Sequence, residues 1–163
     1  MIKSKISLLA LALAAISSQA FAGSATANFQ ANATLSSACT VTASNVSFGT
    51  ITPAATGTVT ANGTITSTCS NNVPYTLAIN AGAGTIAART MAGGTSGNTD
   101  KLAYNLYTSS ALTTVWGDGT TGSTVGMTGT GAVQTNTVYG SLALNQYLKP
   151  DTYTDNLTVT LAY

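Results

Sequence analysis

The twelve residues from Ser24 to Leu35 read SATANFQANATL, and they alternate strictly between polar and apolar side chains. A period of two is typical of a β-strand with one dry face, because successive strand side chains point to opposite faces of a sheet. The stretch contains no Pro and no Gly, so every backbone N–H is free to join a ladder. Its apolar positions are Ala25, Ala27, Phe29, Ala31, Ala33 and Leu35. We therefore expect a strand here, and the rest of the chain must indicate which sheet it joins.

A secretory signal peptide precedes this stretch. Lys3 and Lys5 form a positive n-region, an apolar block runs from Ile6 to Ile16, and small residues end the segment at Ala22. This order predicts a signal peptide over residues 1–22 with cleavage after Ala22. The apolar block is too short to span a bilayer as a retained helix, and no later stretch is apolar enough to do so. We expect an exported chain that is not inserted in a membrane.

The exported chain carries few charges, which excludes several classes of function. Lys3 and Lys5 belong to the signal peptide, which leaves three basic residues against four aspartates, a net charge of −1, with no His. Nucleic acids and anionic membranes bind clustered Lys or Arg. General acid–base catalysis requires a His or a tuned carboxylate, and zinc or iron requires clustered Cys, His and acidic ligands. We therefore expect no enzyme, no cofactor, no metal and no nucleic-acid partner.

Two features have residue types found in binding sites, but we interpret both as structural. The segment from Asp118 to Gly122 offers a carboxylate in a glycine-rich loop, but one carboxylate matches a calcium site poorly, and we interpret the segment as a turn. Trp116 and the seven tyrosines have the rings that sugars stack on. In a chain with so few large side chains we expect them to pack in the core and between sheets.

Alternating or β-rich runs recur along the chain, and no 3.6-residue apolar period persists after the signal peptide. The predicted strands are Cys39–Val41, Val46–Gly49, Thr58–Cys69, Tyr75–Asn80, a short strand near Arg89 and Met91, Lys101–Thr108, Val138–Leu144 and Leu157–Tyr163. No strand is predicted in the Gly- and Thr-rich stretch 120–137. The first two of these are short pieces with a break between them, so the chain has six or seven strands separated by turn residues, which indicates an all-β sandwich. The last strand still needs a neighbour, and no residues follow that could supply one.

The two cysteines, Cys39 and Cys69, lie in an exported chain, so we expect them to form a disulfide. Closing a loop of about thirty residues stabilises a fold by roughly 3–4 kcal/mol on the chain-entropy estimate.

The pattern resembles the spore coat protein U domain family, and within it the major subunits of archaic chaperone–usher pili. The residues that carry the resemblance are Cys39-Thr40-Val41, Val46-x-Phe48-Gly49, Gly63-x-Ile65, Tyr75, Asn80-Ala81-Gly82, Arg89-Thr90-Met91, Leu102-x-Tyr104-x-Leu106-Tyr107-Thr108, Trp116-Gly117-x-Gly119, Pro150-x-x-Tyr153-x-Asp155 and Val159 to Tyr163. They span almost all of Cys39–Tyr163, and their order is more specific than any single motif. One departure is Asp151, which follows Pro150 where the family usually has Gly.

The resemblance implies an incomplete immunoglobulin-like β-sandwich that is completed by a donor strand. In such pilins a periplasmic chaperone lends a strand to the open groove, and at the outer-membrane usher the N-terminal segment of the next identical subunit replaces it. Residues 23–35 are then the donor strand, and residues 36–163 form the pilin domain. The implied groove edge is Leu157, Val159, Leu161 and Tyr163. The implied product is an extracellular pilus on the cell surface that supports adhesion and biofilm formation.

Three alternatives remain open at this stage. The first is that Ala25–Leu35 pairs within its own subunit as an ordinary first strand. The second is a surface-binding tip adhesin, which predicts a second domain or a dedicated aromatic site. The third is a self-assembling coat protein that exchanges strands without forming a pilus, which the sequence does not separate from a pilus subunit.

Overall fold

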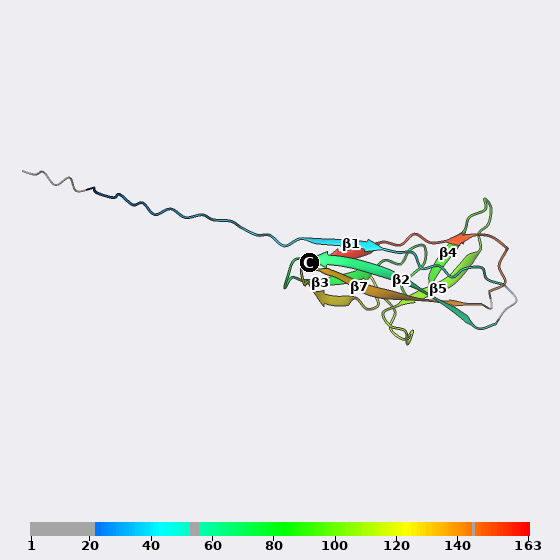
Figure 1. Ribbon diagram of the computed structural model, residues 1–163. Coiled ribbons are helices and arrows are strands. Elements are labelled where there is room, and N and C mark those ends of the chain that lie inside the picture. Colours follow the sequence, from blue (N-terminus) through cyan, green and yellow to red (C-terminus); the bar gives the residue numbers. More distant parts are fainter. Residues whose placement is uncertain (1–21, 53–55, 145) are drawn as a thin grey trace, which may run out of the picture. The chain divides into compact units, whose positions relative to one another are not determined.

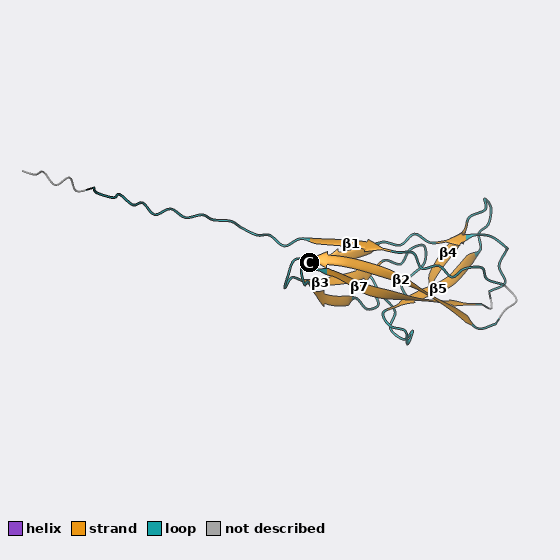
Figure 2. Cartoon of the chain, in the orientation of Figure 1, coloured by secondary structure: helices purple, strands orange, loops and turns teal. Residues whose placement is uncertain are grey.

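The computed structural model describes residues 22–52, 56–144 and 146–163, and every regular element among them is a strand (Figures 1 and 2). The chain divides into two units, Met1–Thr34 and Leu35–Tyr163. The predicted signal peptide lies outside the described residues except for Ala22. The described residues contain no helix with the length and hydropathy that a membrane crossing requires.

The unit from Leu35 to Tyr163 is a sandwich of two antiparallel sheets, which confirms the predicted all-β class. Its strands are β1 (Cys39–Ala43), β2 (Thr58–Cys69), β3 (Pro74–Ile79), β4 (Arg89–Gly93), β5 (Lys101–Tyr107), β6 (Val125–Thr128), β7 (Val133–Ala143), β8 (Tyr153–Thr154) and β9 (Val159–Ala162). The larger sheet has the order β1-β2-β7-β5-β4-β8, and the smaller has the order β6-β3-β9.

The long strands β2 and β7 form the centre of the larger sheet, paired from Thr58 opposite Ala143 to Thr68 opposite Val133 (Figure 1). The predicted alternation of β2 is confirmed, because its even-numbered residues are partly or fully exposed while Ile65 and Cys69 are buried. Leu77 of β3 is fully buried opposite this sheet. Each such side chain contributes about 1.5–3 kcal/mol through its burial, so the core between the sheets holds the fold together.

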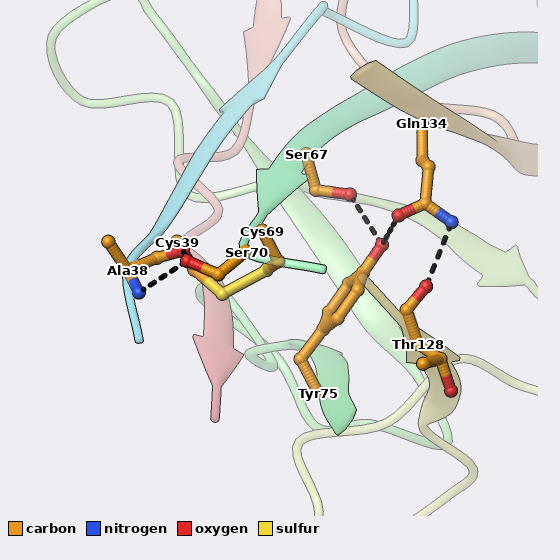
Figure 3. Close-up of a disulfide and its surroundings, with 8 residues drawn as sticks. All are labelled: Ala38, Cys39, Ser67, Cys69, Ser70, Tyr75, Thr128 and Gln134. Atoms are coloured by element: carbon orange, nitrogen blue, oxygen red, sulfur yellow. Dashed lines mark hydrogen bonds between the residues drawn. A yellow bond between two sulfur atoms is a disulfide. The ribbon is translucent and has the colours of Figure 1, made fainter. Parts of the chain in front are cut away.

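A polar bridge joins the two sheets near one end of the sandwich (Figure 3). The hydroxyls of Ser67 on β2 and Tyr75 on β3 are 2.8 Å apart, and Tyr75 also donates to Oε1 of Gln134 on β7 at 3.3 Å. Ser67 and Tyr75 are both buried, and a buried hydroxyl without a partner would destabilise the fold. The bridge explains how a serine is accommodated on the inward face of β2.

Gly63 and Gly140 leave space into which the segment that follows β1 packs, and we call this space the seat. A Cβ atom on Gly63 of β2 would lie 2.7 Å from Cγ2 of Val46, and a Cβ atom on Gly140 of β7 would lie 2.8 Å from Cζ of Phe48. Val46 and Phe48 pack against the core in this way. The predicted strand Val46–Gly49 is wrong, because these residues form no ladder. Their apolar alternation reflects packing onto the glycines rather than strand pairing.

Two further strands, β6 and β7, differ from the prediction. Strand β6 was not expected, because its four residues lie among glycines and threonines, yet it pairs with β3. Strand β7 begins at Val133 rather than Val138, since its inward residues Gln134 and Asn136 are polar and mask the alternation. Gln134 donates to the carbonyl of Thr128 at 3.2 Å, so this polar inward residue has a partner on β6.

Candidate functional site: an open groove and an exposed arm

A groove of about 960 Å³ opens into the core of the Leu35–Tyr163 unit. One wall is the segment 43–51 and the other is the segment 148–157, which leads into β9. Its deepest lining residues are Ile65, Ile79, Leu106, Val138 and Leu142, all members of the buried core. The groove is therefore a gap in the sandwich that exposes apolar core, at the upper end of the volumes found for small-molecule pockets.

The smaller sheet ends on β9, and among the described residues no strand pairs with the far side of β9. The N–H of Asn80 donates to the carbonyl of Thr158 at 3.1 Å, so the backbone groups of Thr158 face β3. In an antiparallel ladder, alternate residues direct both N–H and C=O to opposite sides. The backbone groups of Leu157, Val159 and Leu161 consequently face away from β3. This is the edge that an added strand requires.

The side chains along this edge complete the surface. Leu157, Val159 and Leu161 are partly buried and pack against the core, while Tyr163 is 62% exposed. Side chains of Leu157 and Val159 line the groove itself. An extended segment that pairs with this edge can thus place alternate side chains onto the apolar core.

The arm, which we define as residues 24–35, has no regular secondary structure, and every one of its residues is exposed. The exposed fraction is 92% for Phe29 and 98% for Leu35. The alternative that this stretch pairs within its own subunit stays open beside the donor-strand prediction. Two large apolar side chains in water, with no charged residue between them, leave the arm with an unsatisfied hydrophobic face.

Cys39 and Cys69 are joined by a disulfide that connects β1 to β2 (Figure 3). The two residues lie directly opposite each other in the antiparallel register. A hydrogen bond links the neighbouring residues of the two cysteines, because the N–H of Ala38 donates to Oγ of Ser70 at 3.0 Å. The predicted pairing is therefore present, and it fixes the chain only a few residues after the arm.

Two aspartates, Asp118 and Asp151, are hydrogen-bonded to their own loops. Oδ1 of Asp118 accepts the N–H groups of Thr121 and Thr120 at 2.8 Å each, and these bonds lower its pKa. Asp118 thus holds its own turn. Asp151 accepts from Asn98 Nδ2 at 2.7 Å and from Thr95 N at 2.9 Å, which lowers its pKa to about 2. The family departure at Asp151 therefore ties two loops together.

A third aspartate, Asp155, belongs to a hydrogen-bonded pair that lines the groove. Tyr104 donates its hydroxyl to Oδ2 of Asp155 at 2.7 Å, and both residues line the groove. The pKa of Tyr104 is raised well above its usual value of 10, mainly by burial and secondly by this hydrogen bond. The ring of Tyr104 also meets Phe48 edge-on, with centroids 6.1 Å apart. Tyr104 thus contacts both walls of the groove, Phe48 in segment 43–51 and Asp155 in segment 148–157.

Sequence reasoning missed part of this site. It named the β9 edge but not the wall formed by Val46, Phe48 and Ile51, whose register depends on the glycines of other strands. It placed Arg89 in a short strand and in a family motif, but it did not predict that this side chain is fully buried. The available signal was its context, since Arg89 is the single charged residue between Thr85 and Gly93.

The fold and groove define a class of protein. In a comparison with solved structures, the chain is similar to a chain of the complex between the chaperone CsuC and the tip adhesion subunit CsuE, from archaic chaperone–usher Csu pili of Acinetobacter baumannii. The TM-score is 0.53 at 24% identity, and the alignment covers 80% of this chain and 40% of that chain. This likeness concerns the fold. Together with the open edge of β9, it makes the domain an incomplete immunoglobulin-like sandwich.

The family follows from a second comparison. The family model described as the Spore Coat Protein U domain matches residues 25–160, so the chain belongs to the spore coat protein U domain family. The match begins within the arm and ends within β9. No curated protein matches the chain.

Proposed function

We propose that this chain is a structural subunit, not an enzyme, of a surface pilus that polymerises by donor-strand complementation. The observation that carries the proposal is the free edge of β9 beside a groove that opens onto the core. A strand added there gains main-chain hydrogen bonds, each with a net contribution on the order of 1 kcal/mol, and buries alternate side chains in the groove.

The arm of a second copy is the occupant that suits this groove. Its face of four alanines, Phe29 and Leu35 is apolar, and burial of Phe29 and Leu35 is worth roughly 1.5–3 kcal/mol each. The floor of the groove is equally apolar, and the charged residues in its lining are Lys149, Asp151 and Asp155. An uncharged arm brings no charge of its own that would have to be desolvated there. The proposed domain boundaries are a signal peptide over 1–22, a donor strand over 23–35 and a pilin domain over 36–163.

The proposal includes the partners that such assembly requires. A periplasmic chaperone occupies the groove of the newly exported subunit, and an outer-membrane usher exchanges the chaperone for the arm of the next identical subunit. The similarity in fold to a chain from a chaperone–subunit complex supports the chaperone as a partner. The product is a homopolymeric pilus outside the cell, in the role of a major subunit, and it contributes to adhesion and biofilm formation.

Electron microscopy of the cell surface tests the proposal. Cells that express the chain with its cognate chaperone and usher are expected to carry thin fibres labelled along their length by an antibody against the chain. Labelling only at fibre ends would indicate a tip adhesin, and a continuous layer without fibres would indicate a coat protein.

Deletion of Gly23–Leu35 tests the role of the arm in the same cells. The shortened subunit is expected to remain bound to the chaperone, because its own groove is intact, but fibres are expected to be absent. Fibres of normal length from the shortened subunit would contradict donor-strand assembly. If the chaperone alone keeps the shortened subunit folded and soluble, the absence of fibres reflects a loss of assembly and not a loss of the subunit.

A further inference from the structure

Arg89 lies at the centre of a buried network at the end of β3. Its Nη2 donates to the carbonyl oxygens of Trp116 at 2.7 Å, Asn80 at 2.9 Å and Ile79 at 3.1 Å. Its Nε donates to the same oxygen of Asn80 at 3.1 Å, and Nη1 donates to Oδ1 of Asn105 at 2.8 Å. All of these partners are neutral oxygens. A buried guanidinium is expensive to desolvate, so a network with this composition calls for an explanation beyond packing.

One consequence of this network concerns the hydrogen bonds between the end of β3 and the segment that leads into β9. The carbonyl of Asn80 accepts two hydrogen bonds from Arg89, and the structure gives it none from β9. The N–H of Thr158 instead donates to the side-chain Oδ1 of Asn80 at 2.9 Å, while the N–H of Asn80 donates to the carbonyl of Thr158. The side chain of Asn80 thus replaces its own carbonyl in the last rung between β3 and β9.

A second tie holds the same segment three residues earlier. Asp155 accepts the hydroxyl of Tyr104 through Oδ2 and the N–H of Ala83 through Oδ1, at 2.7 and 2.9 Å. Gly82 makes the approach possible, because its φ is +63° and a Cβ atom there would collide with the carboxylate of Asp155. Residues 155–158 are therefore held at both ends by the loop that leaves β3.

We infer that Arg89, Asn80 and Asp155 are positioning residues that hold segment 155–158 as the entrance of the acceptor edge. This inference rests on the proposed function. Leu157 presents its N–H and C=O to an incoming strand only while Thr158 faces β3, and the Oδ1 of Asn80 keeps Thr158 in that orientation. Asp155, Asn156 and Leu157 all line the groove, so the clamped segment is the part that a donor strand contacts.

The distinction from an ordinary stabilising network is measurable. Asn80 is exposed, and substitution by Ala leaves the backbone carbonyl that Arg89 binds. Asn80→Ala therefore removes the Thr158 acceptor with little change in packing. A purely structural role predicts that strand uptake falls only as far as stability does. Positioning predicts that uptake falls more than stability, and that Asn80→Asp, which keeps an oxygen at the same place, restores it.

The test uses the whole exported chain, Gly23–Tyr163, and a fluorescent synthetic peptide with the sequence of residues 24–35. Uptake rate is measured by the rise in anisotropy, and the denaturation midpoint is measured in urea. Asn62→Ala is the matched control, because Asn62 is an exposed asparagine on the outer side of β2. Asn80→Ala is expected to slow uptake about tenfold, the factor that corresponds to one hydrogen bond, with a midpoint equal to that of the control.

Each outcome has a definite meaning. Slower uptake at an unchanged midpoint, restored by Asn80→Asp, supports the clamp. Uptake by Asn80→Ala at the rate of the unaltered chain overturns the clamp and leaves the proposed function standing, as does a loss of uptake that only matches a loss of stability. If the unaltered chain takes up no peptide at any concentration, the proposed donor-strand function fails, and the clamp fails with it.

Discussion

The arm and strand β2 are both twelve residues long, and both alternate between polar and apolar side chains. Strand β2 pairs with β1 on one side and with β7 on the other, and Ile65 at its centre is fully buried. The arm forms no ladder, and Phe29 at its centre is 92% exposed. The same pattern thus describes a strand that is paired on both sides and a segment whose residues are all exposed.

The difference shows what alternation does and does not encode. A period of two specifies that a segment has one dry face when it is paired, but it does not specify which sheet provides the partner. Strand β2 is committed to its own sheet by Cys69, by the inward Ser67 that meets Tyr75, and by Gly63, which admits Val46. The arm carries no such side chain, since it contains only small or polar residues apart from Phe29 and Leu35. Under the proposed function, this composition leaves it able to pair with another subunit.

The largest expected effect comes from placing the same charge at the centre of each segment. Ile65→Asp buries an unpaired carboxylate in the subunit's own core, at a cost of several kcal/mol, and is expected to abolish the folded subunit. Phe29→Asp places the carboxylate on the dry face of the arm, and is expected to leave the subunit pool intact but to abolish fibres. The measurements are the yield of chaperone-bound subunit and the yield of surface fibres in the same cells.

Asn28→Asp is the matched control for this pair, because Asn28 belongs to the opposite, polar face of the arm. It introduces the same charge one residue away and is expected to change fibre yield little. Normal fibres from Phe29→Asp would refute the donor-strand assignment. Loss of the subunit pool with Phe29→Asp would instead mean that Phe29 belongs to the core of its own subunit.

Much of the fold, but less of the site, was predictable from the sequence. Strands such as β2 and β3 were predictable because their apolar residues face one continuous core, and the disulfide because two cysteines occur in an exported chain. The wall made by Val46 and Phe48 was not, because it depends on glycines that are near them only after β2 and β7 pair. The role of Arg89 was not predictable either, since all but one of its hydrogen bonds go to backbone carbonyls, which no sequence pattern reveals.

The disulfide should stabilise the part of the chain that contains β2 and not the arm. It joins β1 to β2 and closes a loop with a sequence separation of 30, while the arm lies before it. The double substitution Cys39→Ala and Cys69→Ala is expected to lower the free energy of unfolding by about 3–4 kcal/mol, measured by urea denaturation. A reducing agent should produce a similar loss in the unaltered chain and none in the variant. An unchanged midpoint in the variant would contradict the stabilising role of the disulfide.

A smaller effect is expected from the seat beside β2. The Cβ atom of Gly140→Ala would lie 2.7 Å from Cγ1 of Val46 and 3.0 Å from the carbonyl oxygen of Ala61. Such overpacking is expected to cost about 1–3 kcal/mol of unfolding free energy and to displace the groove wall. Gly126→Ala on β6 is the control, because no atom lies within 4 Å of its added Cβ, and it should leave the urea midpoint almost unchanged. Equal midpoints for both variants would show that the seat is not tight.

The smallest effect concerns pH, and it also distinguishes the two segments. The pKa of Asp151 is lowered from 3.8 to about 2, first by its bond from Asn98, and the pKa of Asp118 is lowered too. A lowered pKa gives a contribution to stability that is present above pH 4 and is lost as the pH falls through about 2. The urea midpoint of the domain should therefore decrease between pH 4 and pH 2, and Asp151→Asn should make that decrease shallower. The arm has no titratable side chain, so Asn28→Asp is the change that should give its binding a new dependence on pH in the same range. An equally steep decrease with Asp151→Asn would assign the acid sensitivity to other carboxylates and remove Asp151 from the account of stability.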